Sequence, residues 1–166
     1  MIEVKITKAM KDRAAKKAKE MGEIRNSITH GEGNLAGFIG EEIANKILKG
    51  KIKNTYDYDI VTDDFTYDVK TKRCTSAPKP YYECSIAAYN IKQRCDRYIF
   101  IRVECINEVC TRAWVLGWID KEEYFKRADR LVKGQVDKRN NYTVKADCFN
   151  LRIDELNQFE EELNVN

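Results

Sequence analysis

Two runs rich in apolar, β-branched and aromatic residues, 97–104 and 112–119, constrain the fold more than any other feature of this sequence. They read Arg-Tyr-Ile-Phe-Ile-Arg-Val-Glu and Arg-Ala-Trp-Val-Leu-Gly-Trp-Ile. A strand with one face in water would instead alternate regularly between apolar and polar residues. The runs therefore predict strands at the centre of a sheet that is covered on both faces, with their tryptophans in the core.

Helices are expected before these strands. Residues 6–21 are rich in helix formers and carry six Lys or Arg, which suits either a solvated helix face or a basic arm on nucleic acid. Gly22 could end this helix, and residues 22–34 have the composition of a loop. A second helix is predicted between a possible N-cap, Asn34, and a stop at Gly50. Its apolar stripe comprises Leu35, Ala36, Ile39, Ile43 and Ile47.

The remaining segments complete an alternating order of strands and helices. A hairpin is predicted over 56–72, then a strand at 81–86 and a helix at 87–95. After the two apolar strands we expect a helix that starts with a capping box at Asp120 and Glu123 and reaches Val132, one or two short strands, and a last helix from Asp154. This order predicts an α/β fold with a mixed central sheet and flanking helices.

Composition narrows the class of protein. The 166 residues suit one domain, and the formal net charge of +3 means that any anion binding must come from local clusters. With 43% hydrophobic residues, disorder is not expected. No stretch approaches the length of a membrane span, and we expect no secretory signal at the N-terminus.

Cysteine usage argues against a zinc site. None of the six cysteines is spaced as Cys-x-x-Cys, and His30 is the only histidine, which nearly excludes His-rich metal sites and Cys–His–Asn proteases. We therefore expect buried or half-buried thiols in a reducing cytoplasm, with an iron–sulfur cluster as a remote alternative. The six are Cys74, Cys84, Cys95, Cys105, Cys110 and Cys148.

The hairpin carries the most informative chemistry. A two-residue turn at 63–64 would pair residues whose numbers sum to 127, so that Asp59 faces Asp68. Two opposed carboxylates repel each other, and a divalent cation with oxygen ligands would offset that cost. The same register places Asp57 opposite Lys70, whose side chain shares the face of Asp68. The alternative is a solvated surface on which Asp57 pairs with Lys70, and a bulge would re-aim the facing acids.

A further acid stands on the helix upstream, where Glu41 and Glu42 follow Gly37 and Gly40. Glycine inside a helix costs about 0.5–1 kcal/mol relative to alanine, so two glycines three residues apart suggest close packing of backbone against backbone, with an acid beside the contact. The apolar stripe favours Glu42 as the acid nearer the buried edge. The alternative is that both glutamates are solvated.

Together, Gly40-Glu41, Asp59 and Asp68-Val69-Lys70 resemble the motif of the PD-(D/E)XK nuclease superfamily, and this resemblance favours Glu41. It covers about residues 35–105, with Tyr58 where the family's name implies proline. The resemblance implies a restriction-endonuclease-like α-β-β-β-α-β core and suggests a phage or mobile-element member. It also implies a single nuclease-like domain over 1–166, with a basic N-terminal helix and loop in 1–34, the catalytic core in 35–105, and a sheet extension with C-terminal helices in 106–166.

The activity implied by this resemblance is metal-dependent hydrolysis of phosphodiester bonds in DNA. Asp59, Asp68 and the carbonyl of Val69 would hold Mg²⁺, for which Mn²⁺ would substitute, and Glu41 would bind the metal's water or a second metal. Lys70 would orient the attacking water, help to deprotonate it and stabilise the charged phosphorane.

Candidate contacts to DNA are Lys72, Arg73, Gln93 and Arg94. DNA is the expected partner, and a homodimer remains open. The expected location is the cytoplasm, which would be the host's if the protein is phage-encoded. Two alternatives stand beside this reading: a non-catalytic nucleic-acid-binding module on the same fold, and an RNA-processing nuclease.

Overall fold

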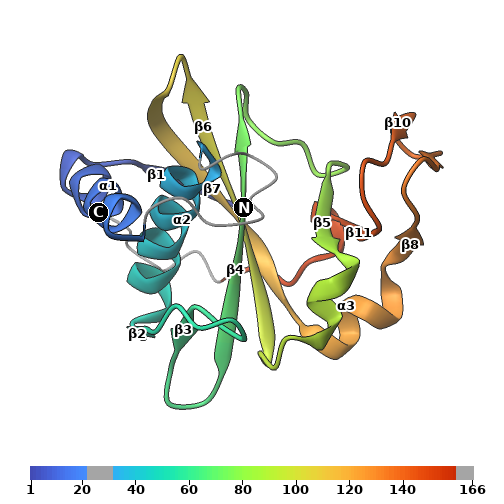
Figure 1. Cartoon of the computed structure of the whole chain (residues 1–166), viewed down its shortest axis with the longest axis horizontal. Coiled ribbons are helices and arrows are strands. Elements are labelled where there is room, and N and C mark those ends of the chain that lie inside the picture. The colour runs from blue at the N-terminus through green and yellow to red at the C-terminus, as the bar shows by residue number, and fades with distance from the viewer. Residues whose placement is uncertain (22–31, 160–166) are drawn as a thin grey trace.

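The computed structural model describes residues 1–21 and 32–159 (Figure 1). The loop expected over 22–31, with His30, and the end of the chain at 160–166 lie outside the described residues. Helix α1 (Lys8–Met21) confirms the first predicted helix, and α2 (Glu32–Leu48) confirms the second. Because α2 already begins at Glu32, the prediction that Asn34 is its N-cap is wrong. Neither of these helices nor the shorter α3 (Lys121–Arg127) is long and apolar enough to cross a membrane.

A six-stranded mixed sheet forms the centre of the molecule. The strands run in the order β1-β7-β6-β4-β3-β2, and every neighbouring pair is antiparallel except β4 and β6, which are parallel. The strands are β1 (Ile2–Lys5), β2 (Lys51–Ile52), β3 (Ile60–Val61), β4 (Thr66–Cys74), β6 (Arg97–Ile106) and β7 (Val109–Asp120).

A second group of elements lies across the central strands from α1 and α2 (Figure 1). It contains a three-stranded antiparallel sheet of order β5-β11-β8 and a separate β9–β10 pair. Its elements are β5 (Glu83–Ala87), the 3-10 helix η1 (Ala88–Lys92), α3 (Lys121–Arg127), β8 (Asp129–Leu131), β9 (Val136–Asp137), β10 (Tyr142–Thr143), β11 (Cys148–Arg152) and the 3-10 helix η2 (Ile153–Glu155).

Side chains of β6 enter two hydrophobic cores, one on each face of the sheet. Ile99 and Ile101 belong to the cluster that includes Ile43 of α2. Tyr98 and Phe100 belong to the cluster on the other face, which includes residues of β5, β11 and α3. Each large apolar side chain that is fully buried contributes about 1.5–3 kcal/mol. The prediction of central strands covered on both faces is confirmed, and Trp114 is buried as expected, whereas Trp118 is half-buried.

Two predicted elements between β4 and β6 differ from expectation. The strand predicted at 81–86 exists as β5, but it pairs with β11 in the smaller sheet rather than with the central strands. The helix predicted over 87–95 is only the 3-10 helix η1 (Ala88–Lys92), after which Gln93 is extended. This extended backbone lets Gln93 reach the candidate site, as described below.

The expected helix after β7 is shorter than predicted. Asp120 is the N-cap of α3, but its carboxylate forms no cap hydrogen bond and instead accepts one from Arg97 Nε at 2.8 Å. The helix ends at Arg127, because the next residues pair with β11 as β8, and this tertiary pairing outweighs their helical propensity. The last helix predicted from Asp154 is, within the described residues, the short η2.

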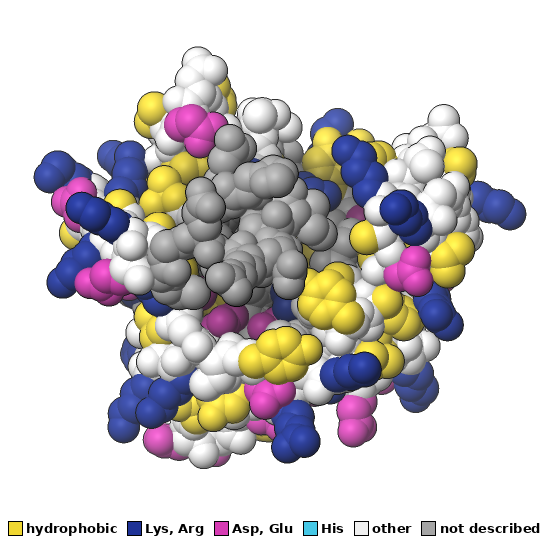
Figure 2. Space-filling model, viewed as in Figure 1, with side chains coloured by type: hydrophobic (Ala, Val, Ile, Leu, Met, Phe, Trp, Pro, Cys, Tyr) yellow, Lys and Arg dark blue, Asp and Glu magenta, His cyan; other side chains and the backbone are white. Residues whose placement is uncertain are grey.

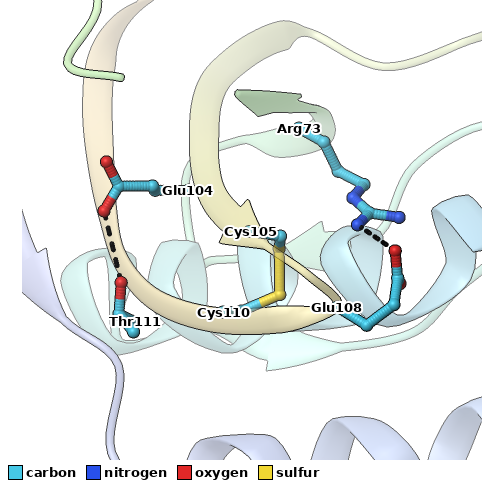
Figure 3. Close-up of a disulfide and its surroundings, with 6 residues drawn as sticks. All are labelled: Arg73, Glu104, Cys105, Glu108, Cys110 and Thr111. Carbon is cyan, nitrogen blue, oxygen red and sulfur yellow. Dashed lines mark hydrogen bonds and ion pairs between the residues drawn. A yellow bond between two sulfur atoms is a disulfide. The ribbon is translucent and has the colours of Figure 1, made fainter. Parts of the chain in front are cut away.

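The β6–β7 hairpin contains a disulfide between Cys105 and Cys110 (Figure 3). Asn107 and Glu108, both with positive φ, form its two-residue turn. The cysteines face each other across the two strands with Cα atoms 4.0 Å apart. The prediction of thiols is therefore wrong for these two cysteines. The other four are free.

Candidate active site

The candidate site lies at the N-terminal end of β3, where β4 continues beyond its pairing with β3. The predicted hairpin register is confirmed, because Ile60 pairs with Tyr67 and Val61 with Thr66. Beyond Ile60 the regular pairing stops: the Asp59 N–H donates to the Tyr67 carbonyl at 2.9 Å, so two consecutive residues oppose Tyr67. Such a bulge redirects the side chains that follow it. The regular facing pair expected for Asp59 and Asp68 therefore does not form.

Asp59 nevertheless lies beside β4, where its Oδ2 accepts a hydrogen bond from the Val69 N–H at 2.7 Å. Within one strand residue, N–H and C=O point to the same side of the strand. The Val69 carbonyl therefore faces the side on which Asp59 lies. Because β3 pairs only with Thr66 and Tyr67, this carbonyl is not committed to pairing with β3.

Asp68, Lys70 and Gln93 form a compact polar network. Asp68 is 5% exposed, and its Oδ2 forms an ion pair with Lys70 Nζ at 2.5 Å. Gln93, which is also buried, donates from Nε2 to Asp68 Oδ1 at 3.1 Å and to the Tyr56 carbonyl at 2.9 Å. Lys70 Nζ donates to Gln93 Oε1 at 3.3 Å. Asp68 Oδ1 thus accepts a hydrogen bond from Gln93, whereas Oδ2 is paired with the Lys70 charge but accepts no hydrogen bond within the described residues.

The negative charges of the site act on one another. Burial, followed by the charges of Asp68 and Glu41, raises the pKa of Asp59 to about 7. The Val69 N–H and the Lys70 ammonium lower this pKa in part. The four predicted catalytic side chains are thus near enough to interact electrostatically, and the acids would be stabilised by a further positive charge.

Of the two glutamates predicted as candidates on α2, Glu41 is the more buried. Glu41 is 8% exposed, whereas Glu42 is half-buried and pairs with Arg13 Nε at 2.7 Å. Glu41 Oε2 accepts hydrogen bonds from Lys17 Nζ at 2.6 Å and from Asn54 Nδ2 at 2.5 Å. The charge of Glu41 acts on Asp59, whereas the apolar stripe had favoured Glu42 as the acid nearer the buried edge.

Gly40 brings α2 close to β4. A Cβ atom on Gly40 would lie 2.0 Å from Thr71 Oγ1, so no larger residue fits without movement. A close approach exists at Gly40, but the predicted contact of backbone against backbone is wrong, because the neighbouring atoms belong to the Thr71 side chain. Close packing is absent at Gly37, where an added Cβ would meet nothing within 4 Å.

The predicted catalytic side chains are not all in direct contact with one another. Asp68 and Lys70 are in direct contact, and Asp59 is held on the neighbouring Val69. Glu41 acts on Asp59 through its charge, while its carboxylate is bound by Lys17 and Asn54. Across residues 1–21 and 32–159, no three acidic, His or Cys side chains are already arranged to hold a metal ion.

The predicted contact between Asp57 and Lys70 is wrong. Asp57 Oδ1 instead accepts a hydrogen bond from the Arg94 backbone N–H at 3.0 Å. Lys70 forms an ion pair with Asp68 and donates a hydrogen bond to Gln93. The bulge at Asp59 explains this difference, because it breaks the register on which the prediction rested.

Two residues of the site escaped the sequence analysis. Lys17 is one of six cations in the first helix, and nothing in its spacing distinguishes it from the others. Asn54 has a positive φ of 49°, a conformation that asparagine adopts more readily than most residues. An asparagine shortly before the strand was the available signal for this position.

The four predicted DNA contacts lie in different places. Gln93 is inside the site, and Arg94 is exposed beside it. Lys72 is exposed on β4, two residues beyond Lys70. Arg73 pairs with Glu108 Oε1 at 2.8 Å, at the turn of the β6–β7 hairpin (Figure 3). On the face seen in Figure 2, Lys and Arg side chains lie mostly toward the edge, and acidic side chains occur both near the middle and at the edge.

Comparisons with known proteins found no matching family model and no significant match among curated proteins.

Proposed function

We propose that this protein is a Mg²⁺-dependent nuclease that hydrolyses phosphodiester bonds in DNA. One observation carries the proposal: Asp59, Asp68 and Lys70 converge with the Val69 backbone where β3 leaves β4. A phosphodiester is an anion that repels a hydroxide nucleophile, so its hydrolysis needs positive charge and a positioned water. This group of residues offers oxygen ligands and an ammonium group at one place.

The order of elements supports the restriction-endonuclease-like core implied by the motif. Helix α2 is followed by the antiparallel strands β2, β3 and β4, then by the helical turn η1 and by β6, which is parallel to β4. This gives α-β-β-β-α-β if η1 stands for the second helix. The third strand is then β4 rather than β5, which belongs to the other sheet.

The donor chemistry of the site suits Mg²⁺. Asp59, Asp68 and the Val69 carbonyl would hold the ion, with Glu41 nearby, and all of these donors are oxygens, which Mg²⁺ and Mn²⁺ accept. The raised pKa of Asp59, caused first by burial and then by Asp68 and Glu41, fits a site that lacks positive charge. When bound, the ion would neutralise phosphate charge and lower the pKa of a water molecule.

Lys70 and Gln93 would do the remaining work of the site. Lys70 Nζ would leave Asp68 Oδ2 for an oxygen of the substrate or of the attacking water, and would stabilise negative charge as it develops. Gln93 would keep Asp68 oriented through its 3.1 Å hydrogen bond while Lys70 moves.

A second candidate is a non-catalytic nucleic-acid-binding module on the same fold. It is favoured by the cations that already pair with the acids, Lys70 with Asp68 and Lys17 with Glu41. Such a module would bind nucleic acid without needing a metal ion. An RNA-processing nuclease would use the same group of side chains on a different polymer.

The test is incubation with plasmid, linear duplex, single-stranded DNA and RNA, each with Mg²⁺, Mn²⁺ or a chelator. We expect cleavage of DNA with either metal and none with the chelator. Asp68→Asn, which keeps the size of the side chain, should abolish cleavage, whereas Asp64→Asn at the exposed hairpin turn should not. Lys70→Ala should lose activity and keep most DNA binding, since one lysine supplies one phosphate contact among several.

Equal activity of the Asp68→Asn and Asp64→Asn variants would refute the catalytic assignment. DNA binding by the wild type without any cleavage would favour the non-catalytic module, and cleavage confined to RNA would favour the RNA-processing alternative. A sedimentation measurement of the same preparation decides between a monomer and the homodimer that the sequence left open.

A further inference from the structure

A groove of about 880 Å³ lies beside the candidate site. A smaller hollow of about 260 Å³ adjoins it and has Lys70 in its wall. Lys72 and Arg102 line both, so the groove begins next to the catalytic lysine. The groove's wall further includes Tyr81, Tyr82, Tyr142 and Lys145.

Two cations stand side by side on the floor between the hollow and the groove. Lys72 of β4 and Arg102 of β6 are direct partners in the parallel pair, and both side chains point away from α2. Like charges directly opposed on neighbouring strands are destabilising. Although Lys72 is exposed at the surface, partial loss of water at the groove and then the charge of Arg102 lower its pKa. An anion placed on this pair would relieve the repulsion.

Arg102 is fixed in place. It is 8% exposed, its Nη2 donates to the Glu83 carbonyl at 3.0 Å, and its guanidinium lies 5.4 Å from the centre of the Tyr82 ring. These contacts hold the Arg102 side chain in one conformation, so it has little conformational freedom to form ion pairs at the surface. Such an anchored cation is suited to a stationary phosphate.

The tyrosines bring a second kind of contact. Tyr81 and Tyr142 are 56% and 51% exposed, although large aromatic side chains lose free energy by lying in water. Alternation of cations with exposed aromatic rings suits a single strand, whose phosphates meet the cations and whose unpaired bases stack on the rings. The bases of a duplex already stack on one another and offer no free face.

The charge of the groove is consistent with this ligand. Among the described residues that line the groove, the one acid is Glu83, which is 8% exposed and has Arg139 Nη1 4.0 Å from its Oε2. The pKa of Glu83 is raised chiefly by burial. Arg139 itself pairs with Asp129 at 2.6 Å. Lys145 is exposed and forms no ion pair within the described residues, so it can meet a phosphate at the rim.

We propose that this groove binds an unpaired strand of the nucleic acid, with a phosphate on Lys72 and Arg102 and a base on Tyr142. The inference rests on the proposed function, since it places this strand next to the phosphate that the Asp68–Lys70 site cleaves. The substrate would then be a nucleic acid with a single-stranded segment at the cut, such as an overhang or a flap.

The experiment measures binding without cleavage. A fluorescein-labelled single-stranded oligodeoxynucleotide, a blunt duplex of the same sequence and that duplex with an overhang are titrated with the full chain in EDTA, and anisotropy is read. We expect the single strand and the overhang to bind more tightly than the blunt duplex. Tyr142→Ala should weaken binding of the single strand by about 5- to 150-fold, and Tyr142→Phe, which keeps the ring, should restore most of it.

The lysines are tested through the salt dependence of the same binding. Lys145→Gln should reduce the slope of log affinity against log salt by about 0.7, the value for one phosphate contact to a single strand. Lys51→Gln, an exposed lysine on the edge strand β2 that does not line the groove, is the matched control and should leave the slope unchanged.

Equal binding of blunt duplex and single strand, or Tyr142→Ala binding as the wild type does, would overturn the proposal. The outcome is separable from that of the proposed function. If the protein binds single strands through the groove but cleaves no nucleic acid, the proposed nuclease activity is refuted and the proposed binding site is supported. If metal-dependent cleavage and strand binding are unchanged by substitution of Tyr142 and Lys145, the nuclease activity is supported and the proposed binding site is refuted.

Discussion

The approach of α2 to β4 predicts opposite effects for the same substitution at two glycines of one helix. At Gly37 an added Cβ meets nothing within 4 Å, so Gly37→Ala should stabilise the protein by about 0.5–1 kcal/mol through the lower backbone entropy of the unfolded chain. For a chain of this size, 1 kcal/mol corresponds to a shift of about 2–4 °C in Tm. We therefore expect a rise of about 1–4 °C.

At Gly40 the same change creates a clash. The new Cβ would lie 2.0 Å from Thr71 Oγ1 and 3.1 Å from Thr71 Cβ, so Thr71 would have to rotate and the backbone to shift. Overpacking of this kind costs about 1–3 kcal/mol, against which the alanine gains about 0.5–1 kcal/mol. We expect a net loss of about 1–2 kcal/mol and a Tm lower by about 2–8 °C.

Thr71→Ala provides the second side of a double-mutant cycle. Thr71 Oγ1 is buried and makes no hydrogen bond in the described structure, so its removal alone should cost little. In that background Gly40→Ala loses its main clash, and the two substitutions should be coupled by at least about 1 kcal/mol.

The assay is urea unfolding of the four proteins of this cycle and of Gly37→Ala, followed by circular dichroism. Equal stabilisation by Gly37→Ala and Gly40→Ala, or a coupling near zero, would refute the packing of α2 on β4. The placement of Glu41 beside the hairpin acids depends on that packing.

Two further predictions concern buried groups. Gln93→Ala removes the hydrogen bond to the buried Asp68 carboxylate, so urea unfolding should show a loss of about 2–4 kcal/mol; a loss below about 0.5 kcal/mol would contradict the network. Burial raises the pKa of Cys84 to about 12, so its thiol stays protonated at pH 8. Mass spectrometry after brief native alkylation should find Cys84 unmodified and the half-buried Cys74 and Cys148 modified first. Rapid labelling of Cys84 would contradict its burial.

Local patterns in the sequence predicted the central strands, the helix α2 and the register of the hairpin. The apolar runs gave β6 and β7, helical spacing gave α2, and the turn at 63–64 gave the pairing of Ile60 with Tyr67. These features depend on neighbours within a few residues, where periodicity and turn chemistry act. The motif around Asp68 and Lys70 could be found for the same reason.

Features that depend on distant pairing were missed. β5 was predicted as a strand, but its partner β11 lies some sixty residues away, and no local signal assigns it to the smaller sheet. The bulge that turns Asp59 toward Val69 leaves the alternation of residues unchanged, so a regular pair was expected. The contact of Lys17 with Glu41 likewise follows from how α1 packs on α2 and not from the sequence of either helix.

Calorimetric titration with Mg²⁺ tests the central claim most directly, because it asks whether Asp59 and Asp68 hold a divalent cation. We predict one saturable binding event in the wild-type protein, kept in Asp64→Asn and lost in Asp68→Asn. No heat from the wild-type protein with either Mg²⁺ or Mn²⁺, or equal heat from all three proteins, would contradict a metal centre at this site.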